Sequence, residues 1–198
     1  MLYRIQKSDI DKAAQILGRS FIDYPIFKYV FPDDQHRKNK IRYLFTFLIK
    51  LGMLNGEVYA SSKDIEAVSI WINSSNARSP LMSAFKAGII SLNLKVDSKS
   101  VKRFSEIGLN KQKIRSDIVN VNYILLDVIG VDPQFQKQGF ARLLMESKLN
   151  DADKYKTPCY LETSNRDNLN FYKKFGFNLI HEYELLKIKV FCLYRKSF

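Results

Sequence analysis

Residues 125–145 decide the fold of this chain, and they read Leu125-Leu126-Asp127-Val128-Ile129-Gly130-Val131-Asp132-Pro133-Gln134-Phe135-Gln136-Lys137-Gln138-Gly139-Phe140-Ala141-Arg142-Leu143-Leu144-Met145. The apolar run at the beginning predicts a buried strand, and the apolar residues after Gly139 recur at helical spacing. From Pro133 to Met145 there is no Asp or Glu, although acidic residues usually occupy the first turn of a helix. Lys137, Arg142 and a glycine stand there instead. Free backbone amides at a helix start, with a glycine that permits close approach, make a site for an anion such as a phosphate.

A steric explanation of the same loop stays open. Many strand-loop-helix units contain one glycine for packing reasons alone. The loop also matches neither of the commoner phosphate motifs, G-x-x-x-x-G-K-[ST] and G-x-G-x-x-G. The anion site is therefore a hypothesis that the rest of the chain has to support.

The composition limits the kinds of protein that this chain can be. With 198 residues and 46% hydrophobic content, it can bury one substantial core, so we expect a single domain or two tightly fused lobes. Its 32 Lys and Arg against 20 Asp and Glu give a net charge of +12. Such a charge suits an anionic partner: nucleic acid, an anionic membrane face or a phosphorylated cofactor.

The positions of cysteine, histidine and apolar residues indicate the cellular compartment and argue against metal and thiol sites. Cys159 and Cys192 stand in apolar strand-like runs without disulfide or zinc spacing, which indicates small core residues in a reducing compartment. No apolar run approaches the roughly 20 residues of a membrane span, and the N-terminus lacks a signal-peptide block. We therefore expect a cytoplasmic protein with no membrane partner. His36 and His181 lack ligand-spaced neighbours, so no metal site is expected, and the absence of a His partner for either cysteine argues against a thiol mechanism.

The first half of the chain predicts a strand, helices and a hairpin. A strand is expected at 2–5, and a helix at about 9–21 that begins with a capping box from Ser8 to Asp11. Aromatic residues follow at 26–31, and an amphipathic helix then runs to Gly52. Paired strands are expected at 57–61 and 66–72. The aromatic side chains here either wall a substrate pocket or belong to the core; the candidates are Phe21, Tyr24, Phe27 and Trp71.

The second half predicts two helical regions and then alternating strands and helices. Residues 81–94 are expected to form a mostly apolar helix. Residues 98–118 are expected to form a strongly basic helix whose charged side chains face solvent. After the opening stretch we expect a strand at 158–164, a helix at about 167–175, and strands near 177–185 and 188–195. This order indicates an α/β layer architecture with a locally parallel pair of central strands.

Two stretches of this sequence carry a family resemblance. Residues 136–141 (Gln136-Lys137-Gln138-Gly139-Phe140-Ala141), which follow Val131-Asp132-Pro133, resemble the Q/R-x-x-G-x-G/A signature of the GNAT acetyltransferases. Residues 161–177 resemble the second signature of that family, in which a strand, an Asn, a Tyr and Gly-Phe follow one another. Residues 20–33 and 68–71 are similar to the branch that contains puromycin acetyltransferase-like small-molecule enzymes. The resemblance is strongest over 123–177.

The resemblance implies a fold and assigns acceptor binding and cofactor binding to different parts of the chain. The fold is a mixed, mainly antiparallel central sheet with a locally parallel, splayed strand pair and helices on both faces. Residues 1–198 would form one domain, in which 1–120 mainly bind the acceptor and 121–198 bind acetyl-CoA. A monomer or a homodimer is expected.

The resemblance also implies acetyl-CoA as cosubstrate, without a metal. Its pyrophosphate would lie on the amides of 138–142, and its pantetheine would bond to the backbone near Ile129 and Val131. Gly130 suggests a bulge or a close backbone approach in that strand. The signature departs from the usual pattern at Lys137 and Gln138, where a glycine and a basic residue are common, and it ends in alanine, so side-chain roles are less firmly implied there than backbone roles. The candidate cofactor-binding residues are Ile129, Gly130, Val131, Gln136, Lys137, Gln138, Gly139, Phe140, Ala141, Arg142, Asn165 and Asn168; the two asparagines would cap a helix and bond cofactor amides.

The implied chemistry is direct attack of a neutral amine on the thioester. Tyr172 matches the family's acid for the departing thiolate, although packing on its helix face is the alternative role. The base is open between Glu162, which we slightly prefer, Asp127, and water. We expect an N-acetyltransferase of a small primary amine. The alternatives are acetylation of a protein N-terminus or lysine, and a non-catalytic acyl-CoA-sensing or nucleic-acid-binding protein; nucleic acid is disfavoured because no stacking-aromatic motif accompanies the basic residues.

Overall fold

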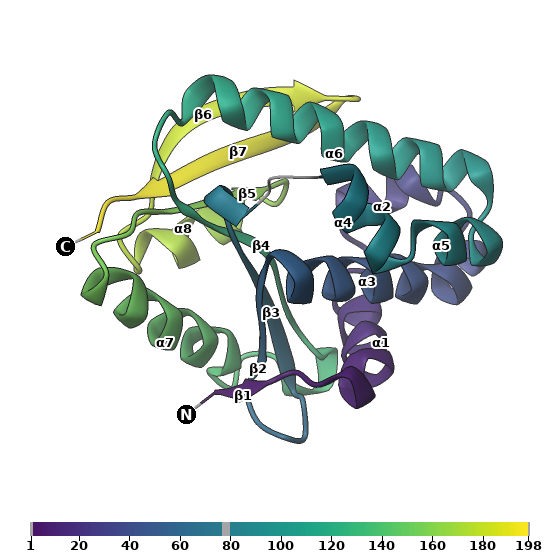
Figure 1. Cartoon of the computed structure of the whole chain (residues 1–198), viewed down its shortest axis with the longest axis horizontal. Helices are drawn as coiled ribbons and strands as arrows, with labels where there is room; N and C mark the ends of the chain where they lie inside the picture. The colour runs from purple at the N-terminus through teal and green to yellow at the C-terminus, as the bar shows by residue number, and fades with distance from the viewer. Residues whose placement is uncertain (1, 77–79, 198) are drawn as a thin grey trace.

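A seven-stranded sheet with the order β1-β2-β3-β4-β5-β7-β6 runs through the molecule (Figure 1). The computed structural model describes residues 2–76 and 80–197. All neighbouring strands are antiparallel except β4 and β5, which are parallel. The mixed, mainly antiparallel sheet with one parallel pair is therefore confirmed. The strands are β1 Tyr3–Arg4, β2 Gly56–Ala60, β3 Ala67–Asn73, β4 Ile124–Val131, β5 Cys159–Thr163, β6 Asn178–Leu185 and β7 Ile188–Arg195.

Helices cover both faces of this sheet (Figure 1). Buried side chains of α1, α3 and α6 pack with β2, β3 and β4 in one core cluster, whereas those of α7 and α8 pack with β4, β5 and β7 in another. Within the described residues, no helix is long and apolar enough to cross a membrane. The helices are α1 Ile10–Ser20, α2 Pro25–Val30, α3 Asp34–Asn55, α4 Pro80–Ala87, α5 Ile89–Lys95, α6 Ser98–Ile118, α7 Phe140–Lys154 and α8 Asn168–Lys173, with 3-10 turns at Lys7–Asp9, Ser74–Asn76 and Pro133–Phe135.

One expected capping box and two expected helix boundaries are wrong, each for a local reason. Asp9 accepts a hydrogen bond from the amide of Gln6 at 2.8 Å, so the capping box precedes the expected Ser8 box, and α1 begins at Ile10. Gly52 does not end α3: it is buried inside the helix, and a Cβ there would lie 2.5 Å from Ile70 Cγ2. The glycine thus lets α3 approach the sheet. The expected helix at 81–94 is split in two at Gly88, which has a φ of +95°.

The two central strands separate after three residue pairs. β4 and β5 are paired only from Ile124 with Cys159 to Leu126 with Leu161, although β4 continues to Val131 and β5 to Thr163. Beyond these pairs the facing edges of the two strands are not hydrogen-bonded to each other. The expected splay is present, and it opens a slot in the middle of the sheet.

A β-bulge in β4 stands at the beginning of this slot. Against β3, Val128 pairs with Ile70 and Leu126 with Trp71, so Asp127 is the extra residue. A bulge bends its strand and redirects a side chain. Gly130, the other position considered for a bulge, is one of close approach instead: a Cβ there would lie 2.8 Å from Leu17 Cδ2, so the glycine brings α1 against β4.

Candidate active site

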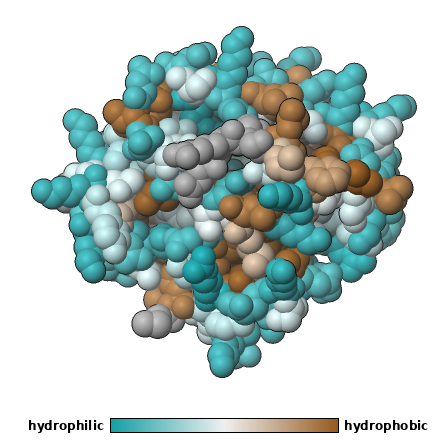
Figure 2. Space-filling model, viewed as in Figure 1, coloured by the Kyte–Doolittle hydropathy of each residue, from teal (hydrophilic) through white to brown (hydrophobic). Residues whose placement is uncertain are grey.

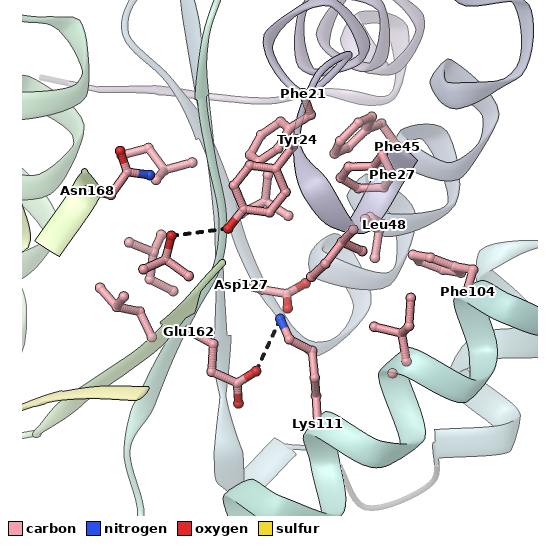
Figure 3. Close-up of a pocket in the computed structure, with 18 of the residues that line it drawn as sticks. Phe21, Tyr24, Phe27, Phe45, Leu48, Phe104, Lys111, Asp127, Glu162 and Asn168 are labelled. Carbon is pink, nitrogen blue, oxygen red and sulfur yellow. Dashed lines mark hydrogen bonds and ion pairs between the residues drawn. The ribbon is translucent and has the colours of Figure 1, made fainter. Parts of the chain in front are cut away.

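A cavity of about 170 Å³ lies at the slot, between the aromatic segments around α1 to α3 and the helix α6 (Figure 3). An engineered apolar cavity of about 150 Å³ holds benzene, so this space suits a small molecule. Its walls come from α2, α3, α6 and α8, from the segment between α1 and α2, and from the two splayed strands. The lining residues are Phe21, Tyr24, Ile26, Phe27, Phe45, Leu48, Phe104, Ile107, Gly108, Lys111, Leu126, Asp127, Val128, Ile129, Leu161, Glu162, Thr163, Asn168 and Tyr172.

One end of the cavity is aromatic. The ring of Phe27 lies 5.8 Å from that of Phe21 and 5.0 Å from that of Phe45, centroid to centroid, and Phe104 lines the same space from α6. The Phe21–Phe27 pair is edge-to-face and the Phe27–Phe45 pair is tilted, and such contacts between rings build an apolar wall. Three of the four expected acceptor-site residues, Phe21, Tyr24 and Phe27, therefore line the cavity. The fourth, Trp71, is only 2% exposed in the core, and its Nε1 donates to Ser69 Oγ at 3.0 Å.

The carboxylate of Asp127 marks the polar end of the cavity (Figure 3). The bulge turns Asp127 toward the cavity, where its side chain is accessible, while protein surrounds it on the other sides. Burial raises the pKa of Asp127 above its ordinary value, against the opposing influence of Arg115 and Lys111. A carboxyl group with a raised pKa that faces a cavity has the properties of a general base.

Glu162 lies beside Asp127 but is enclosed by partners. Its side chain is 2% exposed, and Lys111 Nζ approaches Oε2 to 3.1 Å while Arg115 Nη1 lies 3.7 Å from Oε1. The hydroxyl of Tyr160 donates to Oε1 at 3.0 Å, and that of Tyr183 to Oε2 at 3.5 Å. A buried carboxylate needs partners of this kind. Glu162 therefore pairs with both cations of α6 and has little surface left for a substrate.

Lys111 and Arg115 are not among the site residues predicted from the sequence, because the charge run at 98–118 indicates a solvated face. Both side chains are largely buried, at 23% and 17% exposure. Burial disfavours the charge of Lys111, but its attraction to Glu162, Tyr24 and Asp127 outweighs that effect and raises the pKa. A signal was present: Phe104 and Ile107 begin a stripe at helical spacing that the two cations continue, so the same face of the helix points inward.

Tyr172, on α8, reaches the cavity from the opposite side of the slot. It is buried, and among the described residues its hydroxyl has no hydrogen-bond partner. Burial, with a smaller contribution from Tyr24, raises the pKa of Tyr172 well above its ordinary value. The hydroxyl therefore stays protonated and remains free to donate into the cavity.

The neighbouring tyrosine has a different environment. Tyr24 accepts a hydrogen bond from the amide of Ser164 at 2.6 Å and lies 3.1 Å from Thr163 Oγ1. Because both partners belong to the end of β5, Tyr24 ties the segment before α2 to the splayed strand. This contact closes the cavity on that side.

The two asparagines after β5 take different positions. Asn165 Oδ1 accepts from the amide of Asp167 at 3.0 Å, one residue before α8, so it caps the approach to that helix. Asn168 is the first residue of α8 and lines the cavity, and its side chain bonds no other described residue. Of the two, Asn168 is thus the one that can meet a ligand in the slot.

The loop before α7 presents unpaired amides. Gly139, with a φ of +91°, precedes the helix, and the amides of 138–142 donate to no protein group in the described chain. Lys137 also has a positive φ, +63°, and a Cβ on Gly139 would point into open space. Arg142 is turned away, since its Nε donates to Glu146 at 2.7 Å.

This loop and the slot fit the two ends of acetyl-CoA. Free amides at the first turn of a 15-residue helix suit a diphosphate, and the unpaired strand edges suit an extended amide-bearing chain. In the described chain, no three His, Cys, Asp or Glu side chains are grouped so that they could hold a metal ion.

Comparisons with known proteins agree with this geometry. Residues 106–179 match the family model described as acetyltransferase (GNAT) domain. An uncharacterised N-acetyltransferase of Schizosaccharomyces pombe is 27% identical over 181 residues, which cover 88% of this chain and 72% of that protein.

Solved structures share the fold at low sequence identity. A Corynebacterium glutamicum structure titled histone acetyltransferase HPA2 and related acetyltransferase has a TM-score of 0.71 at 14% identity, covering 100% of this chain and 96% of that one. Arylalkylamine N-acetyltransferase 2 of Aedes aegypti has a TM-score of 0.62 at 15% identity, covering 100% and 99%.

Proposed function

The chain belongs to the GNAT superfamily of acetyltransferases, and we propose that it transfers the acetyl group of acetyl-CoA to the primary amine of a small molecule by direct attack. The observation that carries this proposal is the cavity, which has an aromatic end, a carboxylate and an opening into the slot. An amine with a compact apolar body would place that body against Phe27 and Phe45. Its nitrogen would then lie between Asp127 and the thioester.

We assign the proton transfers to two side chains. Asp127 accepts the proton of the incoming ammonium, directly or through water, because it is the more accessible of the two carboxylates that line the cavity. Tyr172 donates a proton to the departing thiolate, because its hydroxyl is protonated and unpaired. Glu162, the base that the sequence slightly favours, is the poorer candidate because its oxygens already have four partners.

The cofactor site follows from the loop and the slot. The amides of 138–142 hold the diphosphate, while the strand edge near Ile129 and Val131, together with Asn168, holds the pantetheine arm. Lys137, exposed at the loop, adds a positive charge. These residues bind and orient the thioester; the acetyl group itself is supplied by acetyl-CoA.

Acetylation of a protein N-terminus or lysine is the second enzymatic candidate. An extended peptide needs an open groove, whereas this cavity is small and closed on one side by the contact of Tyr24 with β5. The small-molecule amine is therefore the better-supported acceptor. Assay of a peptide panel beside an amine panel separates the two candidates.

We also propose that residues 1–198 act as one domain in the cytoplasm, as a monomer or homodimer. The acceptor cavity draws on both 1–120 and 121–198, so neither part is expected to work alone. Both cysteines are free and buried, as suits a reducing compartment.

The first experiment is a thermal shift with acetyl-CoA on the wild type and on Gly139→Asp. At 100 times the dissociation constant, a ligand adds about 2.7 kcal/mol to the free energy of unfolding. Gly139→Asp places a carboxylate in the open space before α7, so we expect it to abolish the shift. Gly88→Asp is the matched control, because Gly88 also has a positive φ and precedes a helix far from the loop in sequence.

The outcomes are distinct. If the wild type and Gly88→Asp are stabilised and Gly139→Asp is not, the loop binds the cofactor and release of free thiol is then followed across the amine panel. If the wild type does not respond, the assignment of acetyl-CoA to this chain is wrong. If Gly139→Asp responds like the wild type, the diphosphate lies elsewhere.

A further inference from the structure

The outer face of α4 and α5 exposes large apolar side chains. Leu81 is 87% exposed, Phe85 61% and Leu94 83%, and hydrophobic side chains gather where Figure 1 places these two helices (Figure 2). A helix normally turns such residues toward a core, and an exposed apolar patch indicates an interaction surface. We call Leu81, Met82, Phe85, Ile90 and Leu94 the α4–α5 face.

The charged side chains within α4 and α5 are of one sign. The chain has no Asp or Glu between Glu66 and Asp97, and both helices carry an exposed lysine, Lys86 and Lys95. An apolar face with a basic border and no acid is the composition of helices that lie on anionic lipid surfaces.

A cluster of cations adjoins the α4–α5 face; it consists of Lys40, Arg42 and Lys95 around the ring of Tyr43, and we call it the Tyr43 cation cluster. Lys95, next to Leu94, places its Nζ 5.2 Å from the ring centroid of Tyr43 on α3, while Lys40 Nζ lies 5.8 Å and Arg42 Cζ 4.7 Å from the same ring. In the part of the chain that the structure describes, no carboxylate forms an ion pair with any of the three. The Arg42 hydrogen bond holds the pKa of Tyr43 below its ordinary value, as expected in a positive environment.

Two of these cations, Lys40 and Arg42, border an open hollow between α1 and α3. Tyr43, Lys38, Lys40 and Arg42 line it, so it can receive an anionic group. Through Lys95 and Tyr43 the hollow is continuous with the α4–α5 face. Apolar side chains and an anion-binding hollow thus lie next to each other on the molecule.

We propose that the α4–α5 face and the Tyr43 cation cluster dock this protein on the surface of an anionic lipid bilayer. The aliphatic and aromatic side chains enter the boundary between headgroups and acyl chains, and the cations contact lipid phosphates. This surface was not expected from the sequence, because α3 and α5 are brought together only by the fold.

Two other occupants suit the surface less well. In a twofold interface with a second copy, Lys86 and Lys95 would meet a surface of their own sign, and like charges repel there. A nucleic acid would meet exposed aliphatic side chains where its bases need aromatic stacking partners.

The test is cosedimentation of the full chain with vesicles of phosphatidylcholine alone and with about 30% phosphatidylserine added, at physiological salt. Two variants remove the apolar and the charged parts: Phe85→Ser/Leu94→Ser and Lys40→Gln/Arg42→Gln/Lys95→Gln. Their matched controls change exposed residues elsewhere: Leu179→Ser/Ile180→Ser on β6, and Lys154→Gln/Lys173→Gln/Lys174→Gln on and after α7 and α8. A thermal melt of each variant verifies its fold.

We expect the wild type to sediment with the phosphatidylserine vesicles only. The charge variant should bind roughly 100-fold more weakly, since each cation near such a surface contributes about fivefold. The apolar variant should lose binding. Both controls should bind within about twofold of the wild type, because they keep the α4–α5 face and the same cation cluster.

Three results would overturn the proposal. The first is no sedimentation of the wild type with phosphatidylserine. The second is equal weakening by the control variants, which would show a diffuse charge effect. The third is a dimer in light scattering that Phe85→Ser/Leu94→Ser dissociates, which would show that a second copy covers the face.

Discussion

In the role that we propose for it, Asp127 would combine a function with a cost in stability. As a base it has to be ionised, yet burial raises its pKa, and only Lys111 and Arg115 counteract that effect. The acidic limb of kcat/KM should therefore lie above the ordinary aspartate pKa of about 4. We expect Asp127→Asn to lower turnover by about 10² to 10⁴-fold and to remove this limb, as measured by pH–rate profiles. A variant that keeps both the rate and the limb would exclude Asp127 as the base.

The same substitution should stabilise the folded protein at neutral pH. Because the pKa of Asp127 is higher in the folded state than in the unfolded state, the folded state binds more protons between the two values. Its free energy of unfolding thus falls as the pH rises through that window, and it stays lower above it. An uncharged Asn avoids this loss, so its Tm should exceed that of the wild type at pH 7 and the gap should close at low pH. A lower Tm at pH 7 would contradict the argument.

Tyr172 offers a cleaner test of the acid. Phe keeps the ring that packs against Phe171 and Phe177 and removes only a hydroxyl that has no partner among the described residues. We expect Tyr172→Phe to lower kcat by roughly 10²-fold, as for loss of a general acid. The dissociation constant of acetyl-CoA, measured by titration calorimetry, should change only a few-fold. An unchanged kcat would leave Tyr172 with a packing role alone.

At the scale of elements, α6 is held on the sheet by a buried ion-pair cluster. Removal of one partner from such a cluster leaves uncompensated charge and costs roughly 3–5 kcal/mol. Glu162→Gln leaves Lys111 and Arg115 without their carboxylate, so we expect a loss of about that size in denaturant unfolding. The acidic limb of kcat/KM should persist in this variant, in contrast to Asp127→Asn. Loss of that limb with unchanged stability would make Glu162 the base instead.

The elements themselves were largely predictable, whereas their contacts were not. Strong periodicity placed α6 at 98–118 and the strands of both halves within a few residues. The bulge at Asp127 left no trace in the sequence, since strand register depends on the partner strand. Gly52 shows the same limit: a glycine near a helix end reads as a stop signal, but here the neighbouring Ile70 requires it inside the helix.

At the scale of the whole molecule, the two halves of the site differed in how well they could be predicted. The proposed cofactor half lies in one continuous strand-loop-helix unit, so the absence of acids and the position of Gly139 are visible in the sequence. The acceptor cavity draws single residues from segments up to 151 positions apart, from Phe21 to Tyr172, and Trp71 shows that an isolated aromatic gives no sign of which side it faces. Lys111 and Arg115 differ in this respect, because the stripe that begins with Phe104 and Ile107 indicates their side of α6 although the charge run suggests a solvated face.

The net charge of +12 leads to a last prediction. A strongly basic molecule attracts the anionic acetyl-CoA over distances that salt controls, because the Debye length shortens from about 30 Å at 0.01 M to about 10 Å at 0.1 M. We therefore expect the KM for acetyl-CoA to rise several-fold across this range, while the KM for the amine does not rise. Lys137→Gln tests whether one local contact is responsible: it should raise the KM for acetyl-CoA at every salt concentration and leave most of the salt dependence. If Lys137→Gln abolishes that dependence, or if the wild type shows none, the field of the whole molecule does not guide the cofactor.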